Sequence, residues 1–285
     1  MNYPVTRAAS FALLLLLAVS CARTDEPTPA ATAGRDDNLA LGNPSGATAS
    51  TATPTNYLLS KDQYTLSYNR DQGKPNWVSW HLSQAWEGSA PRQDDFRADA
   101  SLPSSWYQVK ASDYTGSGFD RGHNCPSADR NGSVADNSAT FLMSNMMPQA
   151  PNNNQQTWAN LENYARSLAD AGNELYIICG SYGRGGTGSA GYQTTIASGK
   201  VTVPAHCWKV LVVLPVGSND VARITSSTRV IAVDTPNDNS LSTSWGSYRT
   251  SVDKIEAASG LDLLSVLSLS LQGGLEAKTD MGPTN

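Results

Sequence analysis

The sequence predicts an α+β domain in which a central, mainly antiparallel β-sheet is flanked by helices. Several short runs alternate apolar and polar residues as strands do, and two longer stretches repeat apolar residues at helical spacing. Hydrophobic residues make up 39% of the 285-residue chain and charged residues 16%, which is typical of a globular protein. The net charge of −5 predicts a soluble chain and weighs slightly against nucleic-acid binding, although a basic patch can exist on an acidic protein.

The first twenty residues have the pattern of a signal peptide. Arg7 precedes the apolar run AASFALLLLLAVS, which is too short to span a bilayer as a helix. The sequence LAVSC that ends this run resembles a lipobox, in which an acylated Cys21 would tether the chain to a membrane. An ordinary cleaved signal is the alternative. Both interpretations predict export, to the periplasm, to the medium, or to a lipid-anchored position at the bacterial envelope.

Three regions are expected after the signal. Residues 22–54 are rich in Pro, Ala, Thr, Ser and Gly without an apolar stripe, which predicts a flexible linker. A folded domain is expected over 55–275 and a tail over 276–285. The Gly-rich stretch 181–200 lacks the residue order of a phosphate-binding loop and is expected to be a mobile loop. Within the domain, strands are expected at 63–69, 77–82, 174–180, 208–214 and 229–234.

Two helices are expected within this domain. The stronger pattern covers 153–171, where apolar residues recur at helical spacing and Gly172 follows as a stop signal. The second covers 251–258 and is followed by Gly260. Both would pack on the sheet.

The cysteines leave one question open. The chain has four, Cys21, Cys125, Cys179 and Cys207, and no CxxC pair, which argues against a zinc–thiolate site. Cys179 and Cys207 lie in two strand-like runs that could be neighbours, so a disulfide between them is one alternative. Burial of each as a small apolar residue is the default.

The run FDRGHNCPSADR at 119–130 places a histidine among polar and turn-forming residues. His123 can take a proton from water near neutral pH, and Gly122 allows close approach of another group. Asp120 and Arg121 place one negative and one positive charge beside it. The other two histidines, in VSWHLS and VPAHCW, lack such neighbours, and we expect them to pack or hydrogen-bond within the sheet.

A second unusual stretch, FLMSNMMPQAPNNNQQTWANLENYAR, covers 141–166. An α-helix would place Asn154, Glu162 and Arg166 on one broad face. An amide oxygen, a carboxylate and a guanidinium beside one cavity would suit a hydrated divalent cation next to a phosphate. The alternative is that Asn154 is a helix cap and the other two form a surface ion pair.

Together the two stretches resemble the DNA/RNA non-specific endonuclease family, whose signature is the DRGH run, and in particular its secreted NucA-type bacterial members. The resemblance extends from about residue 56 to 270 and implies a ββα-metal active-site core. The segments that carry it are NYLLSKDQYTLSYN, NWVSWHLSQAW, RQDDFRAD, DYTGSGFDRGH, PSADR, FLMSNMMPQAPNNNQQTWANLENYAR, KVTVPAHCWKV, TRVIAVDTPND and YRTSVDKIEAASGLDLL.

The resemblance also implies a role for each site residue. His123 would be the general base, and Asn154 the one direct protein ligand of Mg²⁺, for which Mn²⁺ could substitute. Glu162 would hold two metal-bound waters. The remaining roles would be transition-state stabilisation by Arg92, phosphate binding by Arg121 and Arg166, and orientation of the site by Asp120.

Family members cleave single- and double-stranded DNA and RNA and leave 5′-phosphates, and the same outcome is expected here. The resemblance implies a monomer and allows for a protein inhibitor. A catalytically silent, surface-binding lipoprotein that keeps the fold is one alternative, and a phosphodiesterase for small nucleotides is another. A nuclease needs an open, positively charged groove, whereas an enzyme for small substrates would have a closed pocket.

Overall fold

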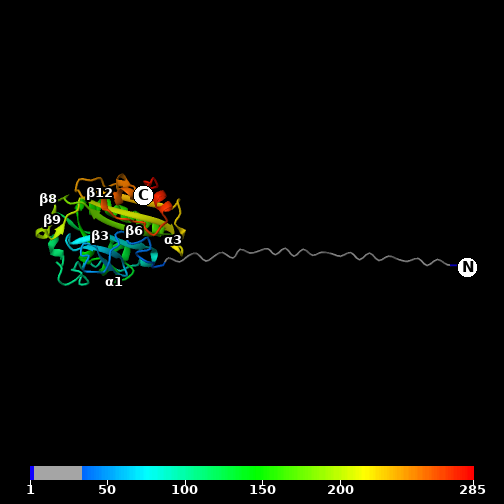
Figure 1. The fold of residues 1–285 in the computed structure, drawn as a ribbon, viewed down its shortest axis with the longest axis horizontal. Coiled ribbons are helices and arrows are strands. Elements are labelled where there is room, and N and C mark those ends of the chain that lie inside the picture. The colour runs from blue at the N-terminus through cyan, green and yellow to red at the C-terminus, as the bar shows by residue number, and fades with distance from the viewer. Residues whose placement is uncertain (3–33) are drawn as a thin grey trace. The chain divides into compact units, whose positions relative to one another are not determined.

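The computed structural model describes residues 1–2 and 34–285 (Figure 1). The predicted signal peptide and Cys21 therefore lie outside the described residues, apart from Met1 and Asn2. The chain divides into two units, Met1–Ala30 and Ala31–Asn285, and the second contains the elements described below. Within the described parts of the chain, no helix has the length and apolar character needed to cross a membrane.

A seven-stranded sheet forms the centre of the second unit, and every neighbouring pair of its strands is antiparallel. The predicted fold class is confirmed, and each of the five expected strands is present. Figure 1 shows β3, β6 and β12 in the body of the fold. In spatial order the strands are β1 (Tyr57–Ser60), β2 (Thr65–Asn69), β3 (Lys74–Leu82), β6 (Asn173–Tyr182), β11 (His206–Pro215), β12 (Arg229–Pro236) and β13 (Arg249–Thr250).

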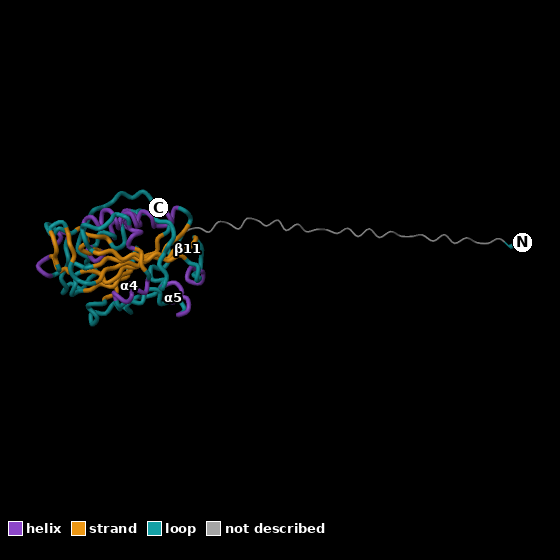
Figure 2. The backbone as a smooth tube through the Cα atoms, turned by 90° about the horizontal axis from the view of Figure 1, so that it is seen from above, coloured by secondary structure: helices purple, strands orange, loops and turns teal. Residues whose placement is uncertain are grey.

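Successive strand residues point to opposite sides of the sheet, and a hydrophobic core covers each side. On β6, Ile177 belongs to the core on one face and Ile178 to the core on the other. Helix α2 (Ala159–Asp170) packs into the first core, and α4 (Val252–Ser259) and α5 (Leu269–Glu276) pack into the second. Figure 2 shows helices on both sides of the strands.

The two predicted helices are present, with one difference. The first begins with a π-helical turn, η5 (Asn153–Trp158), before it continues as α2. Gly172 follows this helix with φ +88°, a conformation that favours glycine. Helix α4 begins at the expected place, where the Ser251 side chain accepts a hydrogen bond from the backbone of Lys254.

The remaining elements are short. The stretch 181–200, expected to be a mobile loop, instead contains a small hairpin and a further strand that pairs with a strand just after it. The short elements are η1 (Gln84–Trp86), η2 (Ala111–Tyr114), β4 (Asp120–His123), η3 (Ser127–Arg130), α1 (Val134–Ala139), η4 (Met143–Asn145), β5 (Met146–Gln149), β7 (Gly186–Gly188), β8 (Gly191–Gln193), β9 (Thr195–Ile196), η6 (Ala197–Gly199), β10 (Val201–Thr202), α3 (Asp220–Arg223) and η7 (Trp245–Tyr248).

The prediction of a flexible linker over 22–54 is wrong for its described part. Leu41, which is 2% exposed, and Ala47 belong to the same core cluster as Trp77. The Trp77 indole also donates a hydrogen bond to Ser45 at 2.8 Å. The segment packs as irregular chain, and its few apolar residues have no period that sequence patterning could detect.

The expected tail at 276–285 is also anchored to the domain. Glu276 is the last residue of α5, and the Asp280 carboxylate accepts hydrogen bonds from Arg229 at 2.8 and 2.9 Å. Arg249 donates to the same carboxylate at 3.3 Å. These ion pairs join residues that are far apart in the sequence, so no local sequence pattern predicts them.

The default interpretation of the cysteines is confirmed, because the three described ones are free and buried. Cys179 lies opposite Lys209 rather than opposite Cys207 in the β6–β11 register. The packing role expected for the other histidines is confirmed as well. His81 is fully buried beside Glu174 at 3.2 Å, and His206 pairs with Asp234 at 3.0 Å.

Candidate active site

Strands β4 and β5, followed by η5 and α2, bring the two unusual sequence stretches together. The strands pair antiparallel, with Asp120 opposite Gln149 and His123 opposite Met146. The helix that begins just after β5 then returns Asn154 to the start of β4. This strand–strand–helix arrangement is the ββα core that the sequence predicts.

Asp120 and Asn154 meet directly. The Asn154 side-chain amide donates a hydrogen bond to Asp120 Oδ2 at 2.8 Å, and the Gln155 amide donates to the same oxygen at 2.8 Å. The bond fixes which side of the Asn154 amide carries nitrogen and which carries oxygen. Among residues 34–285, no group donates a hydrogen bond to Asn154 Oδ1, so this oxygen is free to bind a ligand.

Gly122 has the role that its position in the sequence suggests. A Cβ atom there would lie 2.6 Å from Cβ of Gln149 on the paired strand. Glycine therefore allows β4 and β5 to approach closely beside the site.

A cavity of about 300 Å³ opens over these residues. Two guanidinium groups, from Arg92 and Arg121, line it together with the carboxylate of Asp120 and the amide of Asn154. Such a lining suits a phosphate group. The other lining residues are Asp94, Phe96, Ala111, Tyr114, Thr115 and Phe119.

Both arginines are held in place by neighbours. Arg92 donates hydrogen bonds to Asp94 and to Ser127, each at 2.7 Å. The Arg121 guanidinium lies 4.1 Å from the ring centre of Phe96, within cation–π range. The positive charges at the cavity therefore have defined positions.

His123 packs against two aromatic rings that also pack against each other, with centres 4.9 Å apart. Its ring centre is 5.5 Å from that of Phe96 and 5.0 Å from that of Phe141, both in edge-to-face geometry. Burial, followed by the charges of Arg92 and Arg121, lowers the pKa of His123 to about 3, so the ring is neutral at pH 7. Its Nε2 atom is enclosed and has no hydrogen-bond partner among the described residues, which leaves Nδ1 as the accessible nitrogen.

Glu162 and Arg166 lie on α2 but do not line the cavity. Glu162 accepts a hydrogen bond from the buried Lys209 at 3.0 Å, and burial raises the pKa of Glu162 while Lys209 opposes that shift. Arg166 donates to Asp129 at 2.7 Å. Because η5 is a π turn, the rotation per residue between Asn154 and α2 differs from the α-helical value assumed from the sequence.

Three residues around the site were missed from the sequence: Phe96, Asp129 and Lys209. Lys209 interrupts the apolar strand run HCWKVLVVL, and a charge inside a buried strand was a usable signal. Asp129 lies in the PSADR segment, where it also accepts a hydrogen bond from Trp80 at 3.0 Å. Phe96 carried no local signal.

Two groups of acidic or histidine side chains in the described chain are close enough to share a cation, and neither includes a residue of the cavity. The first combines Asp36, His81, Glu174 and Asp220. Arg223 already donates to Glu174 and to Asp220, each at 2.6 Å, and so supplies that group with a positive charge. The second group lies between α4 and α5.

Comparison with known proteins gives consistent results. The sequence model of the DNA/RNA non-specific endonuclease family matches residues 42–269. A nuclease from Nostoc sp. is 48% identical over 272 residues, which are 94% of this chain and 96% of that protein. Human mitochondrial endonuclease G is 32% identical over 229 residues, 78% of this chain and 74% of that protein.

A similar fold is found among solved structures. A crystal structure of the EndoG/EndoGI complex, described as showing the mechanism of EndoG inhibition, matches with a TM-score of 0.65 at 23% sequence identity. The match covers 81% of this chain and 91% of that chain. At this identity the similarity concerns the fold.

Proposed function

Because this chain belongs to the DNA/RNA non-specific endonuclease family, we propose that it hydrolyses phosphodiester bonds of both DNA and RNA, in single and double strands, and leaves 5′-phosphates. Membership makes the chain an endonuclease, and hence a hydrolase that acts on nucleic acid. The observation that carries the finer proposal is the cavity, where Arg92 and Arg121 meet Asp120 and Asn154 beside the neutral His123.

His123 is the proposed general base. Its neutral imidazole can accept a proton from the attacking water at Nδ1, because Nε2 is enclosed. The charges of Arg92 and Arg121 help to lower the pKa of His123 in the free protein. A phosphate bound between these arginines would neutralise them, so the imidazole becomes a stronger base when substrate is present.

Arg92 and Arg121 would bind the non-bridging phosphate oxygens and stabilise the charge that develops on them. Arg166 would add positive charge from α2, although its guanidinium is engaged with Asp129. Contacts of this kind read the phosphate backbone and not the base edges, which supports cleavage of both DNA and RNA without strict sequence preference.

Asn154 and Glu162 fit a hard divalent cation. Asn154 Oδ1 and Oε2 of Glu162 accept no hydrogen bond from residues 34–285, and oxygen is the donor that Mg²⁺ prefers. We propose that Asn154 binds Mg²⁺ directly and Glu162 through water, with Mn²⁺ as a substitute. Bound there, Mg²⁺ would supply positive charge for the phosphate and for the leaving 3′-oxygen.

Two alternative functions predict different results with nucleic-acid substrates. A catalytically silent binding lipoprotein would bind nucleic acid without cleaving it. A phosphodiesterase for small nucleotides would cleave short substrates and spare plasmid. Arg92, Arg121 and Asn154 line one cavity, and His123 packs against Phe96 in its wall; this intact set favours the nuclease over the silent protein.

We also propose that the chain is exported, to the periplasm, to the medium or to a lipid anchor on Cys21. Mass spectrometry of the mature N-terminus distinguishes a lipidated Cys21 from an ordinary cleaved signal. We propose a monomer as the active form. A protein inhibitor is also proposed, because the related fold of EndoG was solved in a complex described as inhibitory.

The test is digestion of plasmid and of RNA by the full chain with Mg²⁺ or with EDTA, using His123→Ala and Asn154→Ala. Both variants and EDTA should abolish cleavage of both substrates while the far-UV spectrum stays unchanged. His206→Ala is the matched control, because this histidine pairs with Asp234 away from the cavity and should keep full activity. Normal cleavage by Asn154→Ala would refute the proposed metal ligand, and normal cleavage by His123→Ala the proposed base.

A further inference from the structure

A group of three carboxylates lies between α4 and α5, outside the candidate active site. Asp253 and Glu256 belong to α4, and Glu276 ends α5. One oxygen of each lies within 4.8 Å of the others. None of the three lines the cavity over Asn154.

Glu276 is the unusual member of this group. It is 5% exposed, and its Oε1 atom is buried without a hydrogen-bond partner in the described chain. A buried acidic oxygen without a partner costs free energy, because it loses the hydrogen bonds that water would give. Burial, followed by repulsion from Glu256 and Asp253, raises the pKa of Glu276 to about 7.

The acidic groups around Glu276 add further negative charge to this site. Asp262 adds a further repulsion, and Glu256 accepts only a backbone hydrogen bond, from Leu263 at 2.7 Å. No lysine or arginine of residues 34–285 forms a salt bridge with Asp253, Glu256 or Glu276. The group therefore has three acidic side chains and lacks a counter-charge from the described protein.

The other acidic group provides a comparison within the same molecule. There Arg223 forms salt bridges of 2.6 Å with Glu174 and with Asp220. The Tyr176 hydroxyl donates a further hydrogen bond to Asp220. That group is neutralised by the protein's own residues, whereas the group at Glu276 is left open to an external cation.

We propose that Asp253, Glu256 and Glu276 bind a calcium ion that joins α4 to α5. The donor set contains only carboxylate oxygens, which hard cations prefer, and Ca²⁺ accepts such ligands in flexible geometry. Three oxygens within 4.8 Å of one another lie no more than about 2.8 Å from a common point, so small side-chain shifts bring all three to the usual Ca–O distance of about 2.4 Å. Mg²⁺ requires shorter bonds and stricter octahedral geometry, so it fits this group less well.

The ion would have a structural role. Helices α4 and α5 cover one face of the sheet through Ile255 and Leu275, which belong to the same core cluster. A cation between the helices would replace repulsion among their carboxylates with attraction to a shared charge. Calcium would then raise the stability of the fold without entering the reaction at Asn154.

The test measures calcium bound to the full chain by equilibrium dialysis, together with the melting temperature. Glu276→Gln keeps the size of the side chain and removes its charge, so it should bind one calcium ion fewer per chain than the unmodified protein. With calcium at about one hundred times its Kd, the melting temperature of the unmodified chain should rise by roughly 5–10 °C. This rise should be lost in Glu276→Gln.

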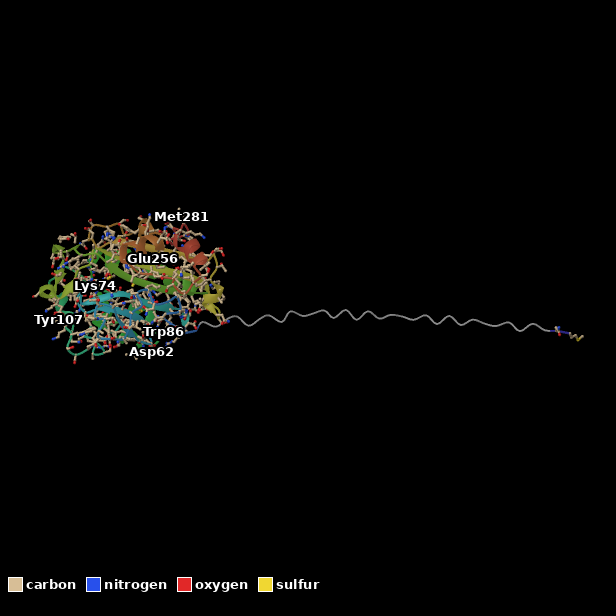
Figure 3. The ribbon with its side chains drawn as sticks, in the orientation of Figure 1. Asp62, Lys74, Trp86, Tyr107, Glu256 and Met281 are labelled. Carbon is tan, nitrogen blue, oxygen red and sulfur yellow. The ribbon has the colours of Figure 1, made fainter. Side chains whose placement is uncertain are left out.

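Asp62→Asn is the matched control, since it removes an exposed carboxylate that lies outside both acidic groups. Figure 3 labels Asp62 near the lower edge of the folded body and Glu256 in its upper half. Asp62→Asn should bind as much calcium as the unmodified chain. Nuclease activity provides the check on folding, and Glu276→Gln should keep it. Equal calcium binding by Glu276→Gln and the unmodified chain would overturn the proposal, and an equal rise with Mg²⁺ at the same concentration would overturn the assignment to calcium.

Discussion

Asp120 accepts a hydrogen bond from the Asn154 side-chain amide across 2.8 Å, and this contact joins strand β4 to the helical turn that follows β5. The two residues are far apart in sequence, yet the contact determines which atom of Asn154 faces the cavity. Because the amide nitrogen is engaged, Oδ1 is the atom left for a cation. Asp120 therefore acts through Asn154 and is a positioning residue.

Replacing Asp120 with alanine should weaken the metal site. The Asn154 amide would lose the acceptor that orients it, and loss of such a supporting partner typically costs about 10–100-fold in metal affinity or activity. We expect the Mg²⁺ concentration for half-maximal plasmid cleavage to rise by that factor. Gln155→Ala is the control, because it removes the other donor to Asp120 Oδ2 and leaves the Asn154 contact in place. An unchanged Mg²⁺ dependence in Asp120→Ala would exclude this role.

Replacing Lys209 with methionine should destabilise the protein. Lys209 is 1% exposed and is the salt-bridge partner of Glu162, so the change would leave a carboxylate that is largely enclosed without a cation. Breaking a buried pair in this way costs about 3 kcal/mol in the free energy of unfolding, measured by urea denaturation.

The double variant Lys209→Met/Glu162→Gln separates stability from function. It removes the unpaired charge and should recover most of the lost stability, but nuclease activity should stay low because Glu162 no longer carries charge. If the double variant were as unstable as Lys209→Met alone, the loss would come from packing against Trp158, whose ring centre lies 4.5 Å from the Lys209 ammonium.

Much of the fold could be predicted, because strands and helices leave a periodic pattern of apolar residues. Those periods located β3, β6, β11 and β12 as well as the helix at 153–171. Regular α-helical geometry could not be assumed for the start of that helix, because a π turn depends on packing and has no distinct sequence pattern. The segment at 34–54 was misjudged for the same reason, since its burial rests on isolated residues such as Leu41.

The candidate site could likewise be predicted only in part. His123, Asp120 and Asn154 stood out because polar residues lie in unusual local company. Lys209 is an unusual charge in an apolar run, but the sequence does not show that its partner is Glu162, which is 47 residues away in the chain. Contacts at such separations are created by the fold, so a single sequence reveals the residues with unusual neighbours more readily than the partners that support them.

Replacing Gly122 with alanine should destabilise the domain. The added Cβ would lie 2.6 Å from Cβ of Gln149, so β4 and β5 would have to separate. Overpacking of this kind costs about 1–3 kcal/mol. Gly273→Ala is the matched control, because a Cβ there meets no atom within 4 Å and alanine favours helix. Urea denaturation showing equal stability for both variants would contradict the predicted clash.

The difference in stability between Glu276→Gln and the unmodified chain should depend on pH in a defined direction when calcium is absent. The pKa of Glu276 is raised in the folded chain to about 7, so the folded state holds its proton more tightly than the unfolded state. Its contribution to stability is present at low pH and is lost as pH rises through about 7. Relative to the unmodified chain, Glu276→Gln should therefore gain roughly 2 kcal/mol between pH 5 and pH 8. A difference in melting temperature that is independent of pH would show that Glu276 ionises normally.

Removal of residues 34–55 should destabilise the domain, although their composition suggests a dispensable linker. The deletion would expose the core surface under Leu41 and Ala47 and remove the Ser45 partner of the Trp77 indole. Loss of this burial and of the hydrogen bond should cost on the order of 3–5 kcal/mol, which lowers the melting temperature by roughly 10 °C. The control is a chain that begins at residue 34, and Leu41→Ala in that chain should reproduce about half of the loss. Equal melting temperatures for the chains that begin at residues 34 and 56 would mean that the segment lies on the domain without stabilising it.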